Sequence, residues 1–158
     1  MKWSGKQYRS ALRPTGRGLC IVMVCTDMSE ADQVSRQLEQ VDNACLVTYR
    51  RAEDLMLNAP CGKVALIILA TADAPMRVKH TLSWLRHRWP RCPITVIGDS
   101  GSGEHEMAAR EGGAFYLTRP VAPEAWEAAL SHALEGQEQI SVRKLPGQDG
   151  PGSYIDNL

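Results

Sequence analysis

The chain has 158 residues, of which 44% are hydrophobic and 23% charged, and its 18 basic and 18 acidic side chains give a net charge of zero. This composition is that of one globular domain with a sizeable core. It argues against wholesale disorder, a collagen-like repeat or a strongly basic nucleic-acid protein. No apolar run approaches the roughly 20 residues that cross a bilayer, so we expect no membrane association. The first residues lack the apolar segment of a secretory signal.

The cysteines indicate a reducing compartment. Their number is odd and none belongs to a Cys-X-X-Cys pair, whereas a disulfide scaffold needs an even set and a zinc site needs paired spacing. We therefore expect reduced thiols, a cytoplasmic location, no metal and no cofactor. The set consists of Cys20, Cys25, Cys45, Cys61 and Cys92.

Charge and composition divide the chain into three parts. Residues 1–17 carry five basic side chains and no acidic one, which predicts a basic N-terminal arm that either keeps the chain in solution or contacts nucleic acid. Residues 18–135 form a body with a net charge of −4. Residues 136–158 are rich in Gly, Pro, Gln and Asp, which predicts a flexible tail.

Five short apolar runs in the body predict buried strands, because their apolar residues follow one another without alternating. The runs cover residues 19–24, 44–49, 64–69, 93–97 and 114–118. Apolar residues at helical spacing predict a helix after each strand, the first capped by Ser29 and the third opened by Pro75. These helices are expected over residues 30–41, 52–58, 75–89, 104–111 and 123–134.

Strands that alternate with helices predict an α/β fold, in which a five-stranded parallel, doubly wound sheet forms a single domain with right-handed crossovers. Ligands of such folds bind outside the carboxyl ends of the strands, near the switch in strand order. The ends of the first, third and fourth strands therefore mark the expected site.

Residues 110–120 carry a resemblance to a known family. Their sequence, REGGAFYLTRP, resembles the EAGADDYLTKP pattern of response-regulator receiver domains, the CheY-like family. The matching positions are Gly112, Tyr116, Leu117, Thr118 and Pro120. The resemblance covers roughly residues 18–135 and implies a regulatory module of a bacterial two-component pathway.

The resemblance also shows which of the family's chemical residues this chain lacks. Receivers accept a phosphoryl group on an aspartate after the third strand, and they hold Mg²⁺ with that residue and an acidic pair after the first strand. Here the acidic pair falls on Cys25 and Thr26, with Asp27 one position late, and the acceptor falls on Ala70 or Thr71. No position of the acceptor or of the pair carries a carboxylate.

Two further family positions concern the response to phosphate. The switch Ser or Thr falls on Gly98, and the invariant Lys falls on Arg119, which keeps the positive charge. The resemblance therefore implies a degenerate receiver, not an enzyme, that acts by phosphorylation-independent contact with other proteins.

Family members usually signal through the fourth helix, fifth strand and fifth helix, so this face is expected to bind a protein partner or a second copy of the chain. In the family the fifth-strand aromatic moves with the switch Thr. Because Gly98 leaves room, we expect Tyr116 to rest inward without phosphorylation, with Phe115 on the opposite side of the strand and Arg110 on the helix beside it.

Several alternatives stay open from the sequence. Asp27, Asp73 and Asp99 each follow a strand and either gather to bind a cation or serve as turn and cap residues. Cys25 is a small buried residue or, beside Arg119, a redox-sensing thiolate.

Two more alternatives concern partners. The basic, aromatic helix with Arg77, Trp84 and Arg88 offers a competing surface for phosphates or an acidic partner. The chain is also compatible with the regulatory domain of a transcription regulator whose DNA-binding part is absent from this sequence, or with a small-ligand domain.

Overall fold

The computed structural model describes residues 18–70 and 73–147, with side chains as far as residue 135. Strands and helices alternate along the chain, as the apolar runs predict. Their order is β1 (Leu19–Cys25), α1 (Met28–Leu38), β2 (Ala44–Tyr49), α2 (Ala52–Leu57), β3 (Lys63–Ala70), α3 (Pro75–Arg88), β4 (Ile94–Asp99), α4 (Gly103–Glu111), β5 (Phe115–Arg119) and α5 (Pro123–Gly147).

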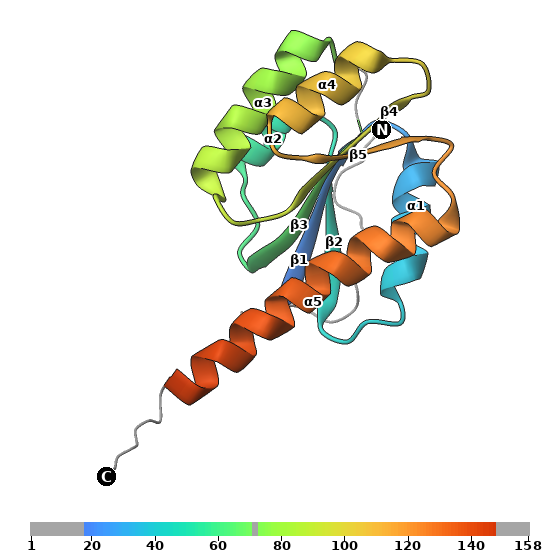
Figure 1. Cartoon of the computed structure of the whole chain (residues 1–158). Helices are drawn as coiled ribbons and strands as arrows, with labels where there is room; N and C mark the ends of the chain where they lie inside the picture. Colours follow the sequence, from blue (N-terminus) through green and yellow to red (C-terminus); the bar gives the residue numbers. More distant parts are fainter. Residues whose placement is uncertain (1–17, 71–72, 148–158) are drawn as a thin grey trace.

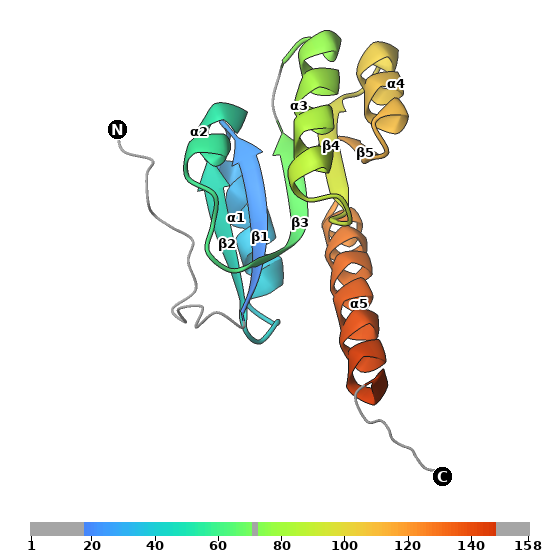
Figure 2. The same cartoon turned by 90° about the vertical axis from the view of Figure 1, so that its left-hand side faces the viewer.

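The strands form one parallel sheet in the order β2-β1-β3-β4-β5, with helices on both faces (Figures 1 and 2). The predicted α/β fold with a doubly wound five-stranded sheet is confirmed. The order reverses between β1 and β3, so the carboxyl ends of these two strands lie at the position where ligands bind in such folds.

Each face of the sheet has its own apolar core. Successive residues of a strand point to opposite faces, so Val22 and Val24 pack with α2, α3 and α4, while Ile21 and Met23 pack with α1 and α5. Trp126 is the largest fully buried side chain of the second core, and its indole N–H donates a hydrogen bond of 2.6 Å to Gln33 Oε1 of α1. This bond fixes α5 against α1.

The beginning of α1 differs from the prediction. Asp27, not Ser29, is the N-cap, and the helix starts at Met28 and ends at Leu38 rather than covering residues 30–41. The Asp27 carboxylate accepts hydrogen bonds from both the backbone N–H and the hydroxyl of Ser29, which makes it the better cap.

The end of the chain also differs. Helix α5 continues to Gly147 rather than ending at residue 134, so residues 136–147, which the composition assigns to a tail, are helical. One glycine costs a helix only about 1 kcal/mol, and Gln, Glu, Arg, Lys and Leu residues that favour helices follow Gly136. The proposed basic arm, residues 1–17, and the last part of the tail, residues 148–158, lie outside the described residues.

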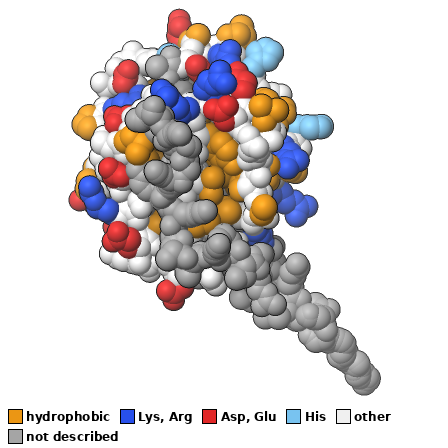
Figure 3. Space-filling view, turned by 180° about the vertical axis from the view of Figure 1, so that it is seen from behind, with side chains coloured by type: hydrophobic (Ala, Val, Ile, Leu, Met, Phe, Trp, Pro, Cys, Tyr) orange, Lys and Arg blue, Asp and Glu red, His pale blue; other side chains and the backbone are white. Residues whose placement is uncertain are grey.

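The described surface mixes charges of both signs. Figure 3 shows acidic and basic side chains interspersed around a central group of hydrophobic ones on the face opposite to that of Figure 1. Among the helices that the structure describes, none has the length and apolar composition needed to cross a bilayer.

Candidate functional site

The carboxyl ends of β1 and β3 bring two of the predicted site residues side by side. Cys25 and Ala70 are partners in the register of these strands, and both are buried. Ala70 offers only a methyl group where the resemblance places the phosphoryl acceptor. Thr26 is exposed at the end of β1, and Thr71, the alternative acceptor position, lies outside the described residues.

Asp27 serves the first helix. Its carboxylate oxygen accepts from Ser29 N at 2.9 Å and from Ser29 Oγ at 2.8 Å. These hydrogen bonds from Ser29 hold the pKa of the Asp27 carboxyl below its ordinary value. The side chain therefore stabilises the exposed first turn of α1, where its negative charge also interacts favourably with the helix dipole.

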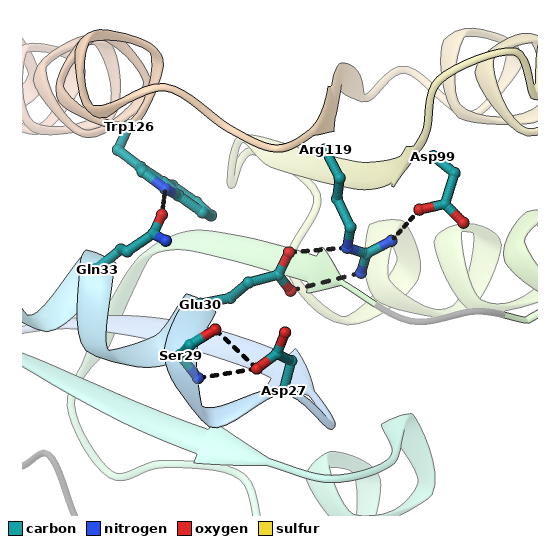
Figure 4. Close-up of polar contacts among 7 residues, drawn as sticks. All are labelled: Asp27, Ser29, Glu30, Gln33, Asp99, Arg119 and Trp126. Carbon is teal, nitrogen blue, oxygen red and sulfur yellow. Dashed lines mark hydrogen bonds and ion pairs between the residues drawn. The ribbon is translucent and has the colours of Figure 1, made fainter.

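The centre of the site is an ion pair between Glu30 and Arg119 (Figure 4). Arg119 Nε donates to Glu30 Oε2 at 2.8 Å, and a terminal guanidinium nitrogen donates to Oε1 at 3.4 Å. Two parallel N–H···O contacts make this the strong geometry for an arginine and a carboxylate. The Glu30 side chain is only 9% exposed, and Arg119 is its partner of opposite charge.

Arg119 holds a second carboxylate on its other side. Its guanidinium donates to Asp99 Oδ1 at 3.3 Å, and the two residues are register partners at the ends of β4 and β5. The Asp99 side chain is 78% exposed, so this contact contributes less than the one with Glu30. Partial burial lowers the pKa of Arg119, but hydrogen bonds to Glu30 and Asp99 outweigh that effect and hold the pKa above its ordinary value.

Glu30 is the site residue that the sequence reasoning missed, because an acid in the first turn of a helix is usually explained by the helix dipole. One signal was present. Glu30, Val34 and Leu38 recur at intervals of four, which places Glu30 on the buried stripe of α1. A charged residue on a buried stripe requires a partner of opposite charge.

Tyr116 occupies the space that Gly98 leaves open. A β-carbon built on Gly98 would overlap the Tyr116 hydroxyl, and the Tyr116 O–H donates to the Asp99 backbone carbonyl at 3.4 Å. Burial raises the pKa of this phenol. The ring packs on the core beneath α3 and α4, so the side chain lies inward over the switch position.

The three aspartates that follow strands do not form a common site. Asp27 caps α1, Asp99 pairs with Arg119, and the Asp73 carboxylate lies 3.9 Å from Arg77 Nε. Among the described residues, no group of three His, Cys, Asp or Glu side chains is arranged to hold a metal ion. The Asp73 carbonyl instead contacts His105 Nε2 at 2.7 Å, which ties the start of α4 to the loop before α3.

Of the two alternatives for Cys25, the structure favours the small buried side chain over the reactive thiolate. The thiol is fully buried, and this burial raises its pKa from about 9 to about 12, with Glu30 and Asp27 adding to the effect. Arg119 lowers the pKa too little to compensate. Cys25 therefore behaves as a small buried side chain.

The proposed interaction face carries exposed groups from α4 and β5. Arg110 forms a two-point pair with Glu106, at 3.0 and 2.8 Å, and both lie on α4. Phe115 is 56% exposed, and its ring stands edge-on to His132 of α5 at 5.5 Å. Phe115 and Tyr116 thus point to opposite sides of β5.

The competing surface on α3 is partly used within the fold. Arg77 pairs with Glu53, and Lys79 pairs with Glu111 at 3.0 Å. Arg86 donates to the backbone carbonyls of Cys92 and Gly113. Three of the basic side chains of this helix therefore hold other elements in place.

Comparison with known proteins identifies the fold. The sequence matches no protein-family model, and no curated protein matches it. The structure is similar to a CheY-like receiver domain from Methanospirillum hungatei, with a TM-score of 0.63 and 16% identity over 78% of this chain and 98% of that one. It is also similar to the BeF3-activated receiver domain of DrrB, with a TM-score of 0.62 and 19% identity over 75% and 98% of the two chains.

A third similar structure is the chemotaxis response regulator CheY4 of Vibrio cholerae, with a TM-score of 0.59 and 18% identity over 74% of this chain and 98% of that one. At these identities the similarity establishes a shared fold, in which the chain spans nearly the whole length of each receiver domain.

The ion pair yields the first prediction. Replacing Glu30 by Gln leaves the guanidinium of Arg119 with only the exposed Asp99, and we expect the free energy of unfolding to fall by about 1–3 kcal/mol, since Arg119 still reaches water. The double variant Glu30→Gln/Arg119→Met should lose less stability than the sum of the losses of the single variants Glu30→Gln and Arg119→Met. Urea unfolding of the two single variants and the double variant measures these losses.

Glu106→Gln, which removes one member of the exposed pair with Arg110, is the matched control and should change stability by less than about 1 kcal/mol. Equal losses for Glu30→Gln and Glu106→Gln would show that the central pair has no special role.

The thiols yield the second prediction. Cys61 is exposed and the other four cysteines are buried, so Ellman's reagent should modify one thiol quickly in the native protein and the others only as the chain unfolds. Cys61→Ser should remove the fast phase. A fast phase that survives this change would contradict the burial of the other thiols.

The same thiols predict loss of stability at high pH. Burial raises the pKa of Cys25 and Cys92 to about 12 in the folded state, whereas both ionise near pH 9 once unfolded. The stability that these two buried, neutral thiols contribute to the folded state is therefore fully present below about pH 8. It is lost as the pH rises toward 12. Urea midpoints between pH 7 and pH 11 should fall less steeply for Cys25→Ala than for the unmodified sequence.

Proposed function

We propose that the chain is a receiver-like regulatory module, not an enzyme, that acts in the bacterial cytoplasm through protein–protein contact and without phosphorylation. The observation that carries this proposal is the pair between Glu30 and Arg119. A carboxylate of the chain itself holds the one positive group that the resemblance assigns to a phosphoryl group.

The chemistry of phosphoryl transfer supports the proposal. An acyl phosphate forms only where a nucleophilic carboxylate is present and where cations neutralise the developing negative charge. At the ends of β1 and β3 this chain has a thiol of raised pKa, Cys25, and a methyl group, Ala70. The guanidinium of Arg119 already contacts two carboxylates.

The position of Tyr116 supports a single working conformation. Its hydroxyl fills the space above Gly98, where any larger residue would meet it. A glycine has no side chain to move, so the link between a phosphoryl group and the aromatic residue is missing. A protein whose population already lies in one state needs no ligand to shift it.

The surface formed by α4, β5 and α5 is the proposed interaction face, with Arg110 and Phe115 as contact residues. Met107 of α4 and Phe115 of β5 are large apolar side chains that are 61% and 56% exposed. Exposed aromatic and methionine side chains beside arginine are typical of protein interfaces. The partner is another protein or a second copy of the chain.

The third prediction tests phosphorylation. Incubation with acetyl phosphate and Mg²⁺, or with beryllofluoride and Mg²⁺, should leave the intact mass and the tryptophan fluorescence unchanged, because no acceptor carboxylate is present. A receiver domain that accepts phosphate serves as the positive control. The variant Glu30→Gln, which leaves Arg119 with only the exposed Asp99, should also stay unmodified. A phosphoryl adduct mapped to the end of β3 would overturn the proposal.

The fourth prediction tests the surface. Arg110→Glu reverses a charge on the proposed face, and Arg88→Glu reverses an exposed charge on α3. Association, measured by light scattering or by pull-down of a partner, should be lost with the first change and kept with the second, while circular dichroism verifies both folds. The reverse result would move the interaction surface to α3.

A further inference from the structure

A groove of about 640 Å³ lies between α5 and strands β4 and β5, on the face of the sheet that α1 and α5 cover. It is lined by residues from the beginnings of β4 and β5, such as Pro93 and Ala114, and so lies at the opposite end of the sheet from the Glu30–Arg119 pair. Its volume falls in the range of sites that bind small molecules.

The groove exists because the side chains of α5 that face β4 and β5 are small and leave space between the helix and the strands. Ala125, Ala128 and Ala129 face the groove, whereas the neighbouring Trp126 and Leu130 fill the core against α1 and β3. Protein interiors are normally packed as densely as organic crystals, and the core around Trp126 and Leu130 beside the groove is filled in this way.

A buried polar group points into the groove. Thr95 of β4 is only 2% exposed and lines the groove beside Leu66 and Leu117. Within the described part of the chain, the Thr95 hydroxyl makes no hydrogen bond. Buried hydroxyls almost always have a partner, so this one has an unused capacity to donate and accept.

The surroundings of Thr95 define the chemistry of the occupant. No acidic side chain lines the groove, and its one arginine, Arg110, is held on α4 by Glu106. Beside Thr95 the walls are apolar, and a charge placed there would lack compensation. Phe115 and His132 carry exposed rings at the opening, where they offer aromatic contacts. The occupant that fits is therefore compact, uncharged and mostly apolar, with one oxygen that meets Thr95.

We propose that this groove is a binding site for a small neutral aromatic or short-chain alcohol, with its hydroxyl bonded to Thr95 and its apolar body against the alanines of α5. The site does not depend on the proposed function, because it shares no residue with the Glu30–Arg119 pair. It opens beside Phe115 and Arg110, so its occupant also lies next to the proposed interaction face.

The test uses two probes that differ in one group. In p-cresol a hydroxyl stands where p-xylene has a methyl group. Titration of the full chain with p-cresol should shift the methyl NMR signals of Leu66, Thr95 and Leu117 until they saturate. p-Xylene should bind about fivefold more weakly, the factor that corresponds to one net hydrogen bond.

Variants locate the site. Thr95→Val should weaken p-cresol binding about fivefold and leave p-xylene binding unchanged, and its urea midpoint should not fall, because the lost hydroxyl had no partner. Ala129→Leu adds a larger side chain to the wall of the groove and should weaken binding of both probes. Ser131→Leu, on the exposed side of the same helix, is the matched control and should bind both as before.

Three results would overturn the proposal. The first is the absence of saturable shifts with p-cresol, which would leave the groove to a protein side chain or to water. The second is an affinity for both probes that Ala129→Leu leaves unchanged. The third is an equal affinity for p-cresol before and after Thr95→Val. If Ala129→Leu does not fold, Ala125→Leu provides the same test from the previous turn of α5. None of these outcomes bears on phosphorylation, so the proposed function stands or falls separately.

Discussion

The ion pair between Glu30 and Arg119 is the constraint on which the site depends. A carboxylate that is 9% exposed cannot lose its partner without a large desolvation cost, so the first turn of α1 must stay beside the end of β5. Asp27 fixes the residue at which α1 begins, and this start sets the direction in which Glu30 points. The cap, the helix and the last strand therefore form one arrangement.

The same pair distinguishes this site from a site that binds phosphate. In a phosphate-binding site a basic side chain waits for an anion that arrives and leaves. Here the anion is Glu30 of the chain itself, which pairs with Arg119 at 2.8 Å. Tyr116 over Gly98 is a second, separate feature of the site, because the aromatic side chain occupies the space beside a residue that has no hydroxyl.

Much of the fold could be predicted because buried parallel strands leave a direct record in continuous apolar runs. The alternation of Phe115 and Tyr116 across β5 follows from strand geometry in the same way. The predicted start of α1 was wrong, because Asp27 and Ser29 are both residue types that cap helices. Only the structure shows that Ser29 donates hydrogen bonds to Asp27. The end of α5 was wrong because Gly136 and its polar neighbours have a composition typical of linkers.

The site was less predictable than the fold, for reasons that lie in the distances between its parts. Glu30 and Arg119 are 89 positions apart, and nothing local to either one names the other. The family resemblance drew attention to Arg119 as a replaced lysine, but only the packing of α1 beside the end of β5 brings Glu30 to it. The groove was equally hidden, since helical spacing tells which alanines face the sheet and not whether they fill the space.

The two ends of the sheet have opposite properties. At the carboxyl end, Arg119 pairs with Glu30 and Asp99, and Tyr116 fills the space beside Gly98. At the other end, the groove under α5 contains Thr95, whose hydroxyl has no hydrogen-bond partner among the described residues. The short strand β5 links the two ends, because Arg119 and Phe115 are its last and first residues and Tyr116 lies between them. The groove that we propose as a binding site and the proposed interaction face therefore meet at the same strand.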